Sequence, residues 1–242
     1  ARGLEVLRTF NRTGRKMTLS QVASETGITR ASARRILLTL IHEGYAVTDG
    51  KMFDLTPQVL ELGHSVLSAK GVWEIAKPFI DQLSAETQES VSAAILDKFD
   101  VVYVSGAQYH RVISVGISIG ARFPAHCTAN GRVLLAAQPE DRWADMLRNI
   151  ELTKMTEKTV TDPKKFRKIL ERVRDQGWSF VDQELEIGLR SISAPVKTES
   201  GVLVGAINIG IPTLRMSPEE IVSDVLQRLQ TTVANISKAL KL

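Results

Sequence analysis

The sequence predicts a mixed α/β (α+β) protein with two domains joined by a helix. Residues 1–56 are expected to form a winged helix-turn-helix, residues 57–70 a linker helix, and residues 71–242 a larger domain in which helices flank a mostly antiparallel sheet. Three observations predict this fold: two short helices separated by a glycine, a hairpin signal directly after them, and a second half that mixes strand-like and helical runs. A chain of 242 residues with 43% apolar residues can bury real cores.

Clear start and stop signals delimit the two short helices. Thr18 and Gln21 have the spacing of a capping box, in which the Thr hydroxyl accepts from the amide three residues on and the Gln side chain reaches back. Gly27 ends the first helix, because glycine enters the left-handed conformation without a Cβ penalty. Thr29 is expected to be the N-cap of the second helix. The stretch 18–42 therefore predicts a helix-turn-helix.

The second short helix carries arginines away from its apolar face. Four apolar residues have the spacing of a buried helix face: Ala33, Ile36, Leu37 and Leu40. Such a helix fits the major groove, where arginines and short side chains contact base edges or phosphates. An ordinary surface helix with solvated arginines is the alternative that this helix alone leaves open. The residues predicted to contact DNA are Ser20, Gln21, Thr29, Arg30, Ser32, Arg34, Arg35 and Lys51.

The next residues favour the DNA-binding interpretation. Asp49-Gly50 lies between the runs 45–48 and 51–55, which both contain apolar residues, and this is a strong short-range hairpin signal. A hairpin directly after a recognition helix is the wing of a winged helix-turn-helix. Residues 1–10 are expected to supply a supporting helix with the inward-facing residues Leu4, Val6, Leu7 and Phe10.

The excess positive charge lies in the first part of the chain. Residues 1–70 hold ten Lys or Arg against six Asp or Glu, a net charge of +4. The whole chain, with 31 basic and 27 acidic residues, also has a net charge of +4, so residues 71–242 are neutral. Positive charge in this part of the chain would neutralise DNA phosphates and release their counterions, which favours DNA binding.

The linker predicts self-association. Residues 58–70 have the broad apolar stripe of an amphipathic helix, which Gly71 ends. An apolar stripe on a linker is most simply buried by a second subunit. We therefore expect a homodimer.

The second half predicts a mostly antiparallel sheet with helices before, between and after its strands. Helices are expected over residues 72–89, 128–137, 139–150, 162–176 and 217–240. Strands are expected over residues 91–96, 101–105, 111–119, 178–183, 191–197 and 202–210. The last helix begins with a capping box at Ser217 and a proline at its first position.

An enzyme is the less favoured interpretation of this second domain. Residues 116–120 match the nucleophile-elbow pattern G-x-S-x-G around Ser118, but the predicted setting is an alternating strand, and no histidine follows His126. Cys127 lies next to His126 in the chain, where side chains point apart, so it is expected to be a packing residue. No Cys/His pair has zinc-ligand spacing, and no metal or cofactor is predicted.

A small-ligand domain explains the sequence better. Small and polar residues interrupt the apolar runs at strand ends and at a helix start: Ala129, Asn130, Ser191, Ser193, Asn208 and Gly210. They leave room and hydrogen-bonding groups for a ligand. The helix start at 128–131 favours an anion, because its free amides point outward. The alternative is that these residues only fit turns and close packing.

With these residues in view, the chain resembles the IclR family of bacterial transcriptional regulators over essentially its whole length. The likeness is carried by ARGLEVLRTF at residues 1–10, by the helix-turn-helix, by GARFPAHCTANGRVLLA from Gly120, by WSFVDQELEIGLRSISAPV from Trp178 and by GVLVGAINIGIP from Gly201. The resemblance implies a winged helix-turn-helix, a linker helix and a GAF-like effector domain. It also implies dimers or tetramers that bind operator DNA.

Residues 109–142 are most similar to the subgroup that controls aromatic-acid breakdown through the beta-ketoadipate pathway. The family's effector pocket, carried over by motif, falls on Ala129, Asn130, Asp182, Ser191, Asn208 and Gly210. Many relatives have serine where Asn208 stands. Asp182 is then expected to accept from a ligand hydroxyl, and Arg111 or Arg122 to pair with a carboxylate if either points inward. A non-aromatic small acid is the alternative effector.

The expected location is the cytoplasm. A single cysteine excludes an internal disulfide, and the sequence contains neither a long apolar run nor a charged-then-apolar leader, so we expect no membrane contact. Two further functions remain open on sequence alone: a Ser118-dependent hydrolase, and a DNA-packaging protein that binds no ligand.

Overall fold

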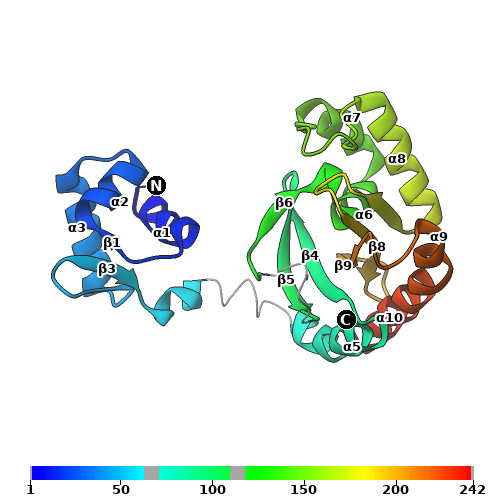
Figure 1. The fold of residues 1–242 in the computed structure, drawn as a ribbon, viewed down its shortest axis with the longest axis horizontal. Helices are drawn as coiled ribbons and strands as arrows, with labels where there is room; N and C mark the ends of the chain where they lie inside the picture. The colour runs from blue at the N-terminus through cyan, green and yellow to red at the C-terminus, as the bar shows by residue number, and fades with distance from the viewer. Residues whose placement is uncertain (1, 63–70, 110–117, 241–242) are drawn as a thin grey trace. The chain divides into compact units, whose positions relative to one another are not determined.

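A computed structural model gives the fold of residues 2–62, 71–109 and 118–240 (Figure 1). The chain forms two compact units, Ala1–Ala69 and Lys70–Leu242, and each is described by itself. Among the residues described, no helix combines the length and apolar character needed to cross a membrane.

The first unit is a winged helix-turn-helix, as predicted. Its elements are α1 (Arg2–Thr13), β1 (Met17–Thr18), α2 (Leu19–Thr26), α3 (Arg30–His42), β2 (Ala46–Thr48), β3 (Met52–Leu55) and a 3-10 turn (Pro57–Leu60). The predicted capping box between Thr18 and Gln21 is present, Gly27 ends α2 with φ 66°, and the Thr29 hydroxyl caps α3. The local signals therefore placed both helices correctly.

The wing is a three-stranded sheet with the order β1-β3-β2. The Asp49 carboxylate accepts from the amides of Lys51 at 2.9 Å and Met52 at 2.7 Å, and Gly50 adopts φ 93°. The predicted hairpin is confirmed, and β1 is a third strand that the sequence interpretation missed. The buried core below the wing consists of Val6, Phe10, Met17, Val22, Ala33 and Leu37.

Two expectations for this part of the chain need comment. Leu4 was predicted to face inward, but its side chain is 57% exposed, because α1 packs through Val6 and Phe10 instead. Leu7 is half-buried. Of the predicted linker helix, the structure describes only the 3-10 turn Pro57–Leu60 and the next two residues, and the remainder lies outside the described residues.

The second unit is a six-stranded sheet between two layers of helices, which confirms the predicted fold class. Its strands are β4 (Ser90–Asp97), β5 (Asp100–Ala107), β6 (Arg122–Pro124), β7 (Ser179–Asp182), β8 (Leu189–Lys197) and β9 (Leu203–Pro212). Each neighbouring pair is antiparallel, in the order β6-β5-β4-β9-β8-β7. Its helices are α5 (Val72–Thr87), α6 (Ala129–Ala136), α7 (Glu140–Asn149), α8 (Pro163–Gln176), the turn α9 (Pro218–Glu220), a π turn (Ile221–Val225) and α10 (Leu226–Ala239).

The two faces of this sheet carry separate cores (Figure 1). Alternation along β9 sends Ile207 and Ile209 toward α5 and α10, and sends Ala206 toward α6 and α8. On the α6 face, Asn208 occupies the next inward position after Ala206. The polar residues of β8 and β9 on that face therefore lie under α6.

Three features of the second unit differ from the expectations or lie partly outside the described residues. Most of the predicted strand 111–119 lies outside the described residues, and its end is a turn in which the Ala121 amide donates to the Ser118 carbonyl oxygen at 3.0 Å. Residues 122–124, which lie outside the predicted strands, form β6 against β5. Ile75, within the predicted helix 72–89, is 40% exposed, because α5 packs through Ala76 and Ile80.

Candidate nucleic-acid interface and ligand cavity

The outer face of α3 is exposed and positively charged. Ala33 and Leu37 are buried in the core of the unit, whereas Arg34 and Arg35 are exposed. In helical projection Arg35 lies opposite the buried face, and Arg30 and Arg34 lie on the side toward the wing. This geometry lets α3 enter a major groove with Arg35 foremost.

A groove of about 550 Å³ lies between α2, α3 and the wing. It brings together four of the predicted DNA contacts, which come from three different elements: Ser20, Arg30, Arg34 and Lys51. Lys51 lies beside the turn at the tip of the wing, and Ser20 lies in the first turn of α2. A phosphate strand that crosses this groove would meet three cations.

The cations on this face lack acidic partners. Among the described residues no ion pair involves Arg30, Arg34, Arg35 or Lys51, which are all exposed. Elsewhere in the unit three cations pair with acids: Arg8 with Glu5, Arg12 with Glu25, and Lys16 with Asp54. Unpaired charge is therefore concentrated on the surface that α3 and the wing form.

The three remaining predicted contacts serve as helix caps. The Gln21 Oε1 atom accepts from the Thr18 amide at 2.8 Å, and the Thr29 hydroxyl accepts from the Ser32 amide at 3.3 Å. The Thr29 hydroxyl also donates to the Ser32 hydroxyl oxygen at 3.0 Å. Gln21 and Thr29 are exposed. Their position permits DNA contact, but their first role is to fix the ends of α2 and α3.

A small cavity lies between the start of α6 and the sheet in the second unit. Four of the six predicted effector contacts line it: Asn130, Ser191, Asn208 and Gly210. The other lining residues are Tyr103, Thr128, Val181, Leu185 and Leu189. The inward positions of β8 and β9 thus face the first turn of α6 across a space of mixed polar and apolar character.

Asn208 carries an unsatisfied polar atom in this cavity. Its side chain is 8% exposed, and its Oδ1 atom is buried without a hydrogen-bond partner among the described residues. A buried carbonyl oxygen without a donor costs about 1–3 kcal/mol, so such atoms normally face a water or a ligand. Asn208 Oδ1 is therefore available to accept from a guest in the cavity.

Asn130 and Tyr103 are two further polar side chains at the cavity wall. Asn130 Oδ1 accepts from the Ser193 hydroxyl at 2.8 Å, and both residues are buried. Burial raises the pKa of the Tyr103 phenol above its ordinary value, and a hydrogen bond with Ser92 partly offsets this effect. Tyr103 is therefore a neutral phenol at physiological pH.

The cavity is nearly closed. Its volume is about 30 Å³, which is enough for one water molecule, whereas a cavity that binds benzene has a volume of about 150 Å³. An aromatic guest would have to displace lining side chains, and Leu185 and Leu189 are the lining residues that come from the loop between β7 and β8 and its junction with β8.

Two predicted effector contacts do not reach the cavity. Val181 faces it, so alternation directs the next residue, Asp182, to the opposite face of β7. The Asp182 carboxylate accepts from Arg190 Nε at 2.8 Å and pairs with Lys158 at 2.9 Å. Ala129 is fully buried at the first position of α6 and does not line the cavity. Asp182 therefore lies away from this cavity and pairs with Lys158 and Arg190.

Of the two arginines considered as carboxylate partners, Arg122 does not lie at the cavity. Arg122 is exposed at the β4–β5 turn, where it pairs with Asp97 at 2.8 Å and Asp100 at 3.2 Å. Arg111 lies outside the described residues. Arg122 therefore does not meet the condition under which it was expected to pair with a carboxylate, which was that its side chain points inward.

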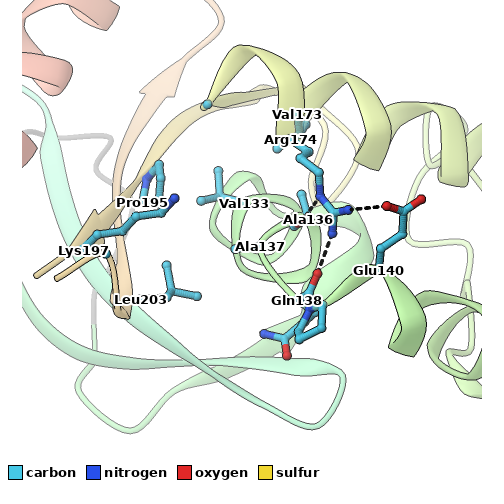
Figure 2. A pocket seen from close by; sticks show the side chains of 13 residues that line it. Val133, Ala136, Ala137, Gln138, Glu140, Val173, Arg174, Pro195, Lys197 and Leu203 are labelled. Atoms are coloured by element: carbon cyan, nitrogen blue, oxygen red, sulfur yellow. Dashed lines mark hydrogen bonds and ion pairs between the residues drawn. The ribbon is translucent and has the colours of Figure 1, made fainter.

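A larger cleft of about 440 Å³ lies at the opposite end of α6 (Figure 2). Ala136 and Leu203 contribute to its apolar lining, and Lys197 projects at one side. At the other side, Arg174 of α8 donates to the carbonyl oxygens of Ala136 and Gln138 (Figure 2). None of the predicted effector contacts lines this cleft.

The residues considered for catalysis are not assembled as a catalytic group. Ser118 is exposed in a turn, which corrects its predicted position within a strand. The His126 ring is buried, and its Nε2 atom lies 2.9 Å from the Thr153 carbonyl oxygen. Burial raises the pKa of the Cys127 thiol to about 11, which fits the predicted packing role.

Comparison with known proteins identifies both units. Residues 1–50 match the IclR helix-turn-helix domain, and residues 64–238 match the bacterial transcriptional regulator IclR C-terminal domain. A fold that joins a DNA-binding wing to a domain with an internal polar cavity defines a ligand-responsive transcriptional regulator. The chain belongs to the IclR family of bacterial transcriptional regulators, as the resemblance predicted.

Three relatives place the chain within this family. It is 40% identical to the Pca regulon regulatory protein of Pseudomonas putida over 91% of this chain and 76% of the relative. It is 44% identical to a transcriptional regulator from Rhodococcus sp. RHA1, with a TM-score of 0.90 over 99% of this chain and 96% of that chain. It is 28% identical to the inducer-binding domain of PobR from Acinetobacter, solved as a double mutant with 3-hydroxybenzoic acid, with a TM-score of 0.65 over 68% of this chain and 97% of that chain.

Proposed function

We propose that this regulator binds operator DNA through α3 and the wing, and that a small aromatic carboxylic acid in the α6 cavity modulates that binding. The observation that carries the ligand part is the buried, unpartnered Asn208 Oδ1 atom in a cavity at a helix start. The relatives support the chemical class, since PobR was solved with a hydroxybenzoic acid.

The cavity offers each chemical feature of a hydroxylated aromatic acid a matching partner. A carboxylate would bind at the first turn of α6, where the amide of Asn130 has no acceptor within the helix. The ring would lie against Val181 and Leu185, and a phenolic hydroxyl would donate to Asn208 Oδ1.

Binding must open the cavity, because its closed volume of about 30 Å³ excludes a ring. The displacement of the lining side chains costs free energy, and this cost reduces the net free energy of ligand binding. A ligand changes DNA affinity only to the extent that it binds two arrangements of the protein differently. The closed cavity is therefore one arrangement, and the ligand stabilises a second, more open one.

The regulator is also proposed to act as a homodimer, with a tetramer as a further assembly. Leu60 is 75% exposed and Leu62 is 52% exposed at the start of the predicted linker. Apolar side chains of this size are normally covered by a partner when they gather on one surface. Light scattering that gives a monomer mass at micromolar concentration would contradict this assembly.

The experiment that tests the ligand is a titration of 4-hydroxybenzoate, protocatechuate and beta-ketoadipate into the protein with and without operator DNA. We expect at least one aromatic acid to bind and to change operator affinity, and Asn208→Leu to weaken that binding by about tenfold or more. Lys197→Ala, in the separate cleft, is the control and should leave ligand affinity unchanged. Binding of beta-ketoadipate alone would assign the cavity to a non-aromatic acid, and loss of affinity in Lys197→Ala alone would move the ligand to the larger cleft.

A further inference from the structure

A buried ion pair fastens the loop that closes the cavity. Arg132, in α6, lies 2.6 Å from Glu184 through Nη2 and Oε2, and the two side chains are 3% and 10% exposed. Arg132 Nε also donates to the His126 carbonyl oxygen at 2.8 Å, and Glu184 Oε2 accepts from the Val160 amide at 2.9 Å. A buried pair with its remaining groups hydrogen-bonded holds one geometry and is costly to break from one side.

The backbone of the same loop is held by two threonines. The Thr159 hydroxyl donates to the Glu184 carbonyl oxygen at 2.6 Å, and the Thr156 hydroxyl donates to the Gln183 carbonyl oxygen at 2.7 Å. Gln183 adopts φ 61°, a left-handed conformation that a residue with a Cβ holds only when its surroundings enforce it. The loop is therefore fixed at its start, next to Glu184.

The next residue turns into the cavity. Leu185 follows Glu184 and lines the cavity, as does Leu189 at the start of β8. The Leu189 amide donates to the Glu186 carbonyl oxygen at 3.2 Å, and the Gln183 amide donates to the Leu189 carbonyl oxygen at 2.8 Å. These two backbone hydrogen bonds close residues 183–189 into one compact turn. We therefore expect Leu185 and Leu189 to move together when Glu184 moves.

We propose that Arg132 and Glu184 are a positioning pair that limits how far the leucines can withdraw, and thereby selects the ligand by size. This inference rests on the proposed function of the cavity. With the pair intact, the leucines return to a near-closed position, and a bulky acid must work against the anchored loop. Without the pair, the loop no longer limits how far the leucines withdraw, and bulky and compact acids enter the cavity equally easily.

The variant that tests the pair is the double substitution Arg132→Leu with Glu184→Leu. It removes both charges together, so no unpaired charge is left in the interior. Arg174→Leu is the control, because Arg174 holds the far end of the same helix through the Ala136 and Gln138 carbonyl oxygens and does not touch the loop (Figure 2). If the double variant does not fold, Arg132→Gln with Glu184→Gln replaces it, since the amide oxygen at position 184 can still accept from the Val160 amide and no charge is left in the interior.

Two measurements on the full-length protein separate this inference from the proposed function. The first is amide hydrogen exchange over residues 183–189 without ligand, which we expect to be about tenfold or more faster in the double variant and unchanged in Arg174→Leu. The second is the ratio of the Kd values of 4-hydroxy-3-methoxybenzoate and 4-hydroxybenzoate, which we expect to fall about tenfold in the double variant only.

Each outcome has one meaning. Unchanged exchange over 183–189 overturns the role of the pair whatever the ligand is. Faster exchange with an unchanged Kd ratio leaves the pair as a structural anchor and overturns its part in size selection. An equal fall of the ratio in Arg174→Leu also overturns it, because general loosening of α6 would then suffice. If the wild-type protein binds neither acid, the proposed ligand class fails and size selection fails with it, while the exchange result still decides whether the pair anchors the loop.

Discussion

Ser193 on β8 donates its hydroxyl to Asn130 Oδ1 at 2.8 Å, shares it with the Ile207 carbonyl oxygen at 2.8 Å, and so ties the first turn of α6 to β8. Ser193 is fully buried, and the register pairs it with Ser179 of β7. Ser179 is also buried, but its hydroxyl oxygen has no hydrogen-bond partner among the described residues. Two serines side by side in one sheet therefore have opposite roles.

Ser193→Ala should lower the free energy of unfolding of the second unit by about 1–3 kcal/mol, because it leaves the buried Asn130 amide oxygen without its donor. Ser179→Ala should leave the free energy of unfolding unchanged or raise it, since the substitution removes a buried hydroxyl that makes no hydrogen bond among the described residues. Urea unfolding of the two variants beside the wild type measures the difference. Equal destabilisation by both substitutions would contradict the assignment of the hydrogen bond.

Asp182→Asn should lower stability at neutral pH and leave ligand affinity unchanged. Burial alone raises the pKa of the Asp182 carboxyl, but hydrogen bonds from Lys158, Arg190 and Gln183 outweigh it and leave this pKa below its ordinary value of 3.8. The folded pKa is depressed, so the stability that the carboxylate contributes is present above pH 3.8 and disappears as the pH falls through the folded pKa. Unfolding curves of variant and wild type should therefore converge in acid. A loss of ligand affinity instead would return Asp182 to the cavity.

The family resemblance pointed to four residues that line the proposed cavity, but the pattern of β7 could not decide which face of that strand lines it. Phe180 and Val181 are both apolar, because both faces of this strand are covered, so no polar–apolar alternation marked the inward side. Asp182 was carried over from the family's motif, and the pattern of β7 supplied no check on the face that it occupies. Leu185 was missed for a related reason: an isolated leucine in a loop carries no sign of the cavity that it closes.

Local sequence signals were sufficient where the hydrogen-bond partner lies only a few residues away in the chain. The caps at Thr18 and Thr29 and the left-handed Gly27 depend on residues three or four positions away, and all three are confirmed. The exposure of Leu4 depends instead on how α1 packs against residues distant in the sequence, and the two-residue strand Met17–Thr18 depends on pairing with β3. Such features follow from tertiary packing, which overrides local propensity.

Cys127 should resist thiol reagents in the folded protein. Its side chain is fully buried, and burial raises its pKa to about 11, so almost no thiolate is present at pH 8. We expect stoichiometric labelling by a chromogenic disulfide reagent only after unfolding in denaturant. Ser179→Cys is not a suitable control because that site is buried as well, whereas Ser118→Cys places a thiol in the exposed turn and should react at once. Fast labelling of the wild-type protein would mean that the start of α6 opens readily in the native state.

Arg35→Ala should lower affinity for operator DNA by about 1–3 kcal/mol while changing affinity for random DNA little, if Arg35 contacts a base edge as its position opposite the buried face of α3 predicts. Lys51→Ala, at the tip of the wing, should weaken both kinds of complex alike and reduce the salt dependence of binding by about one charge, because a phosphate contact reads no sequence. Arg8→Ala is the matched control, since Arg8 pairs with Glu5 on α1. Fluorescence anisotropy with operator and scrambled duplexes over a salt series resolves the three cases. Equal losses on both duplexes for Arg35→Ala would reassign Arg35 to a phosphate and leave base recognition to Arg30 and Arg34.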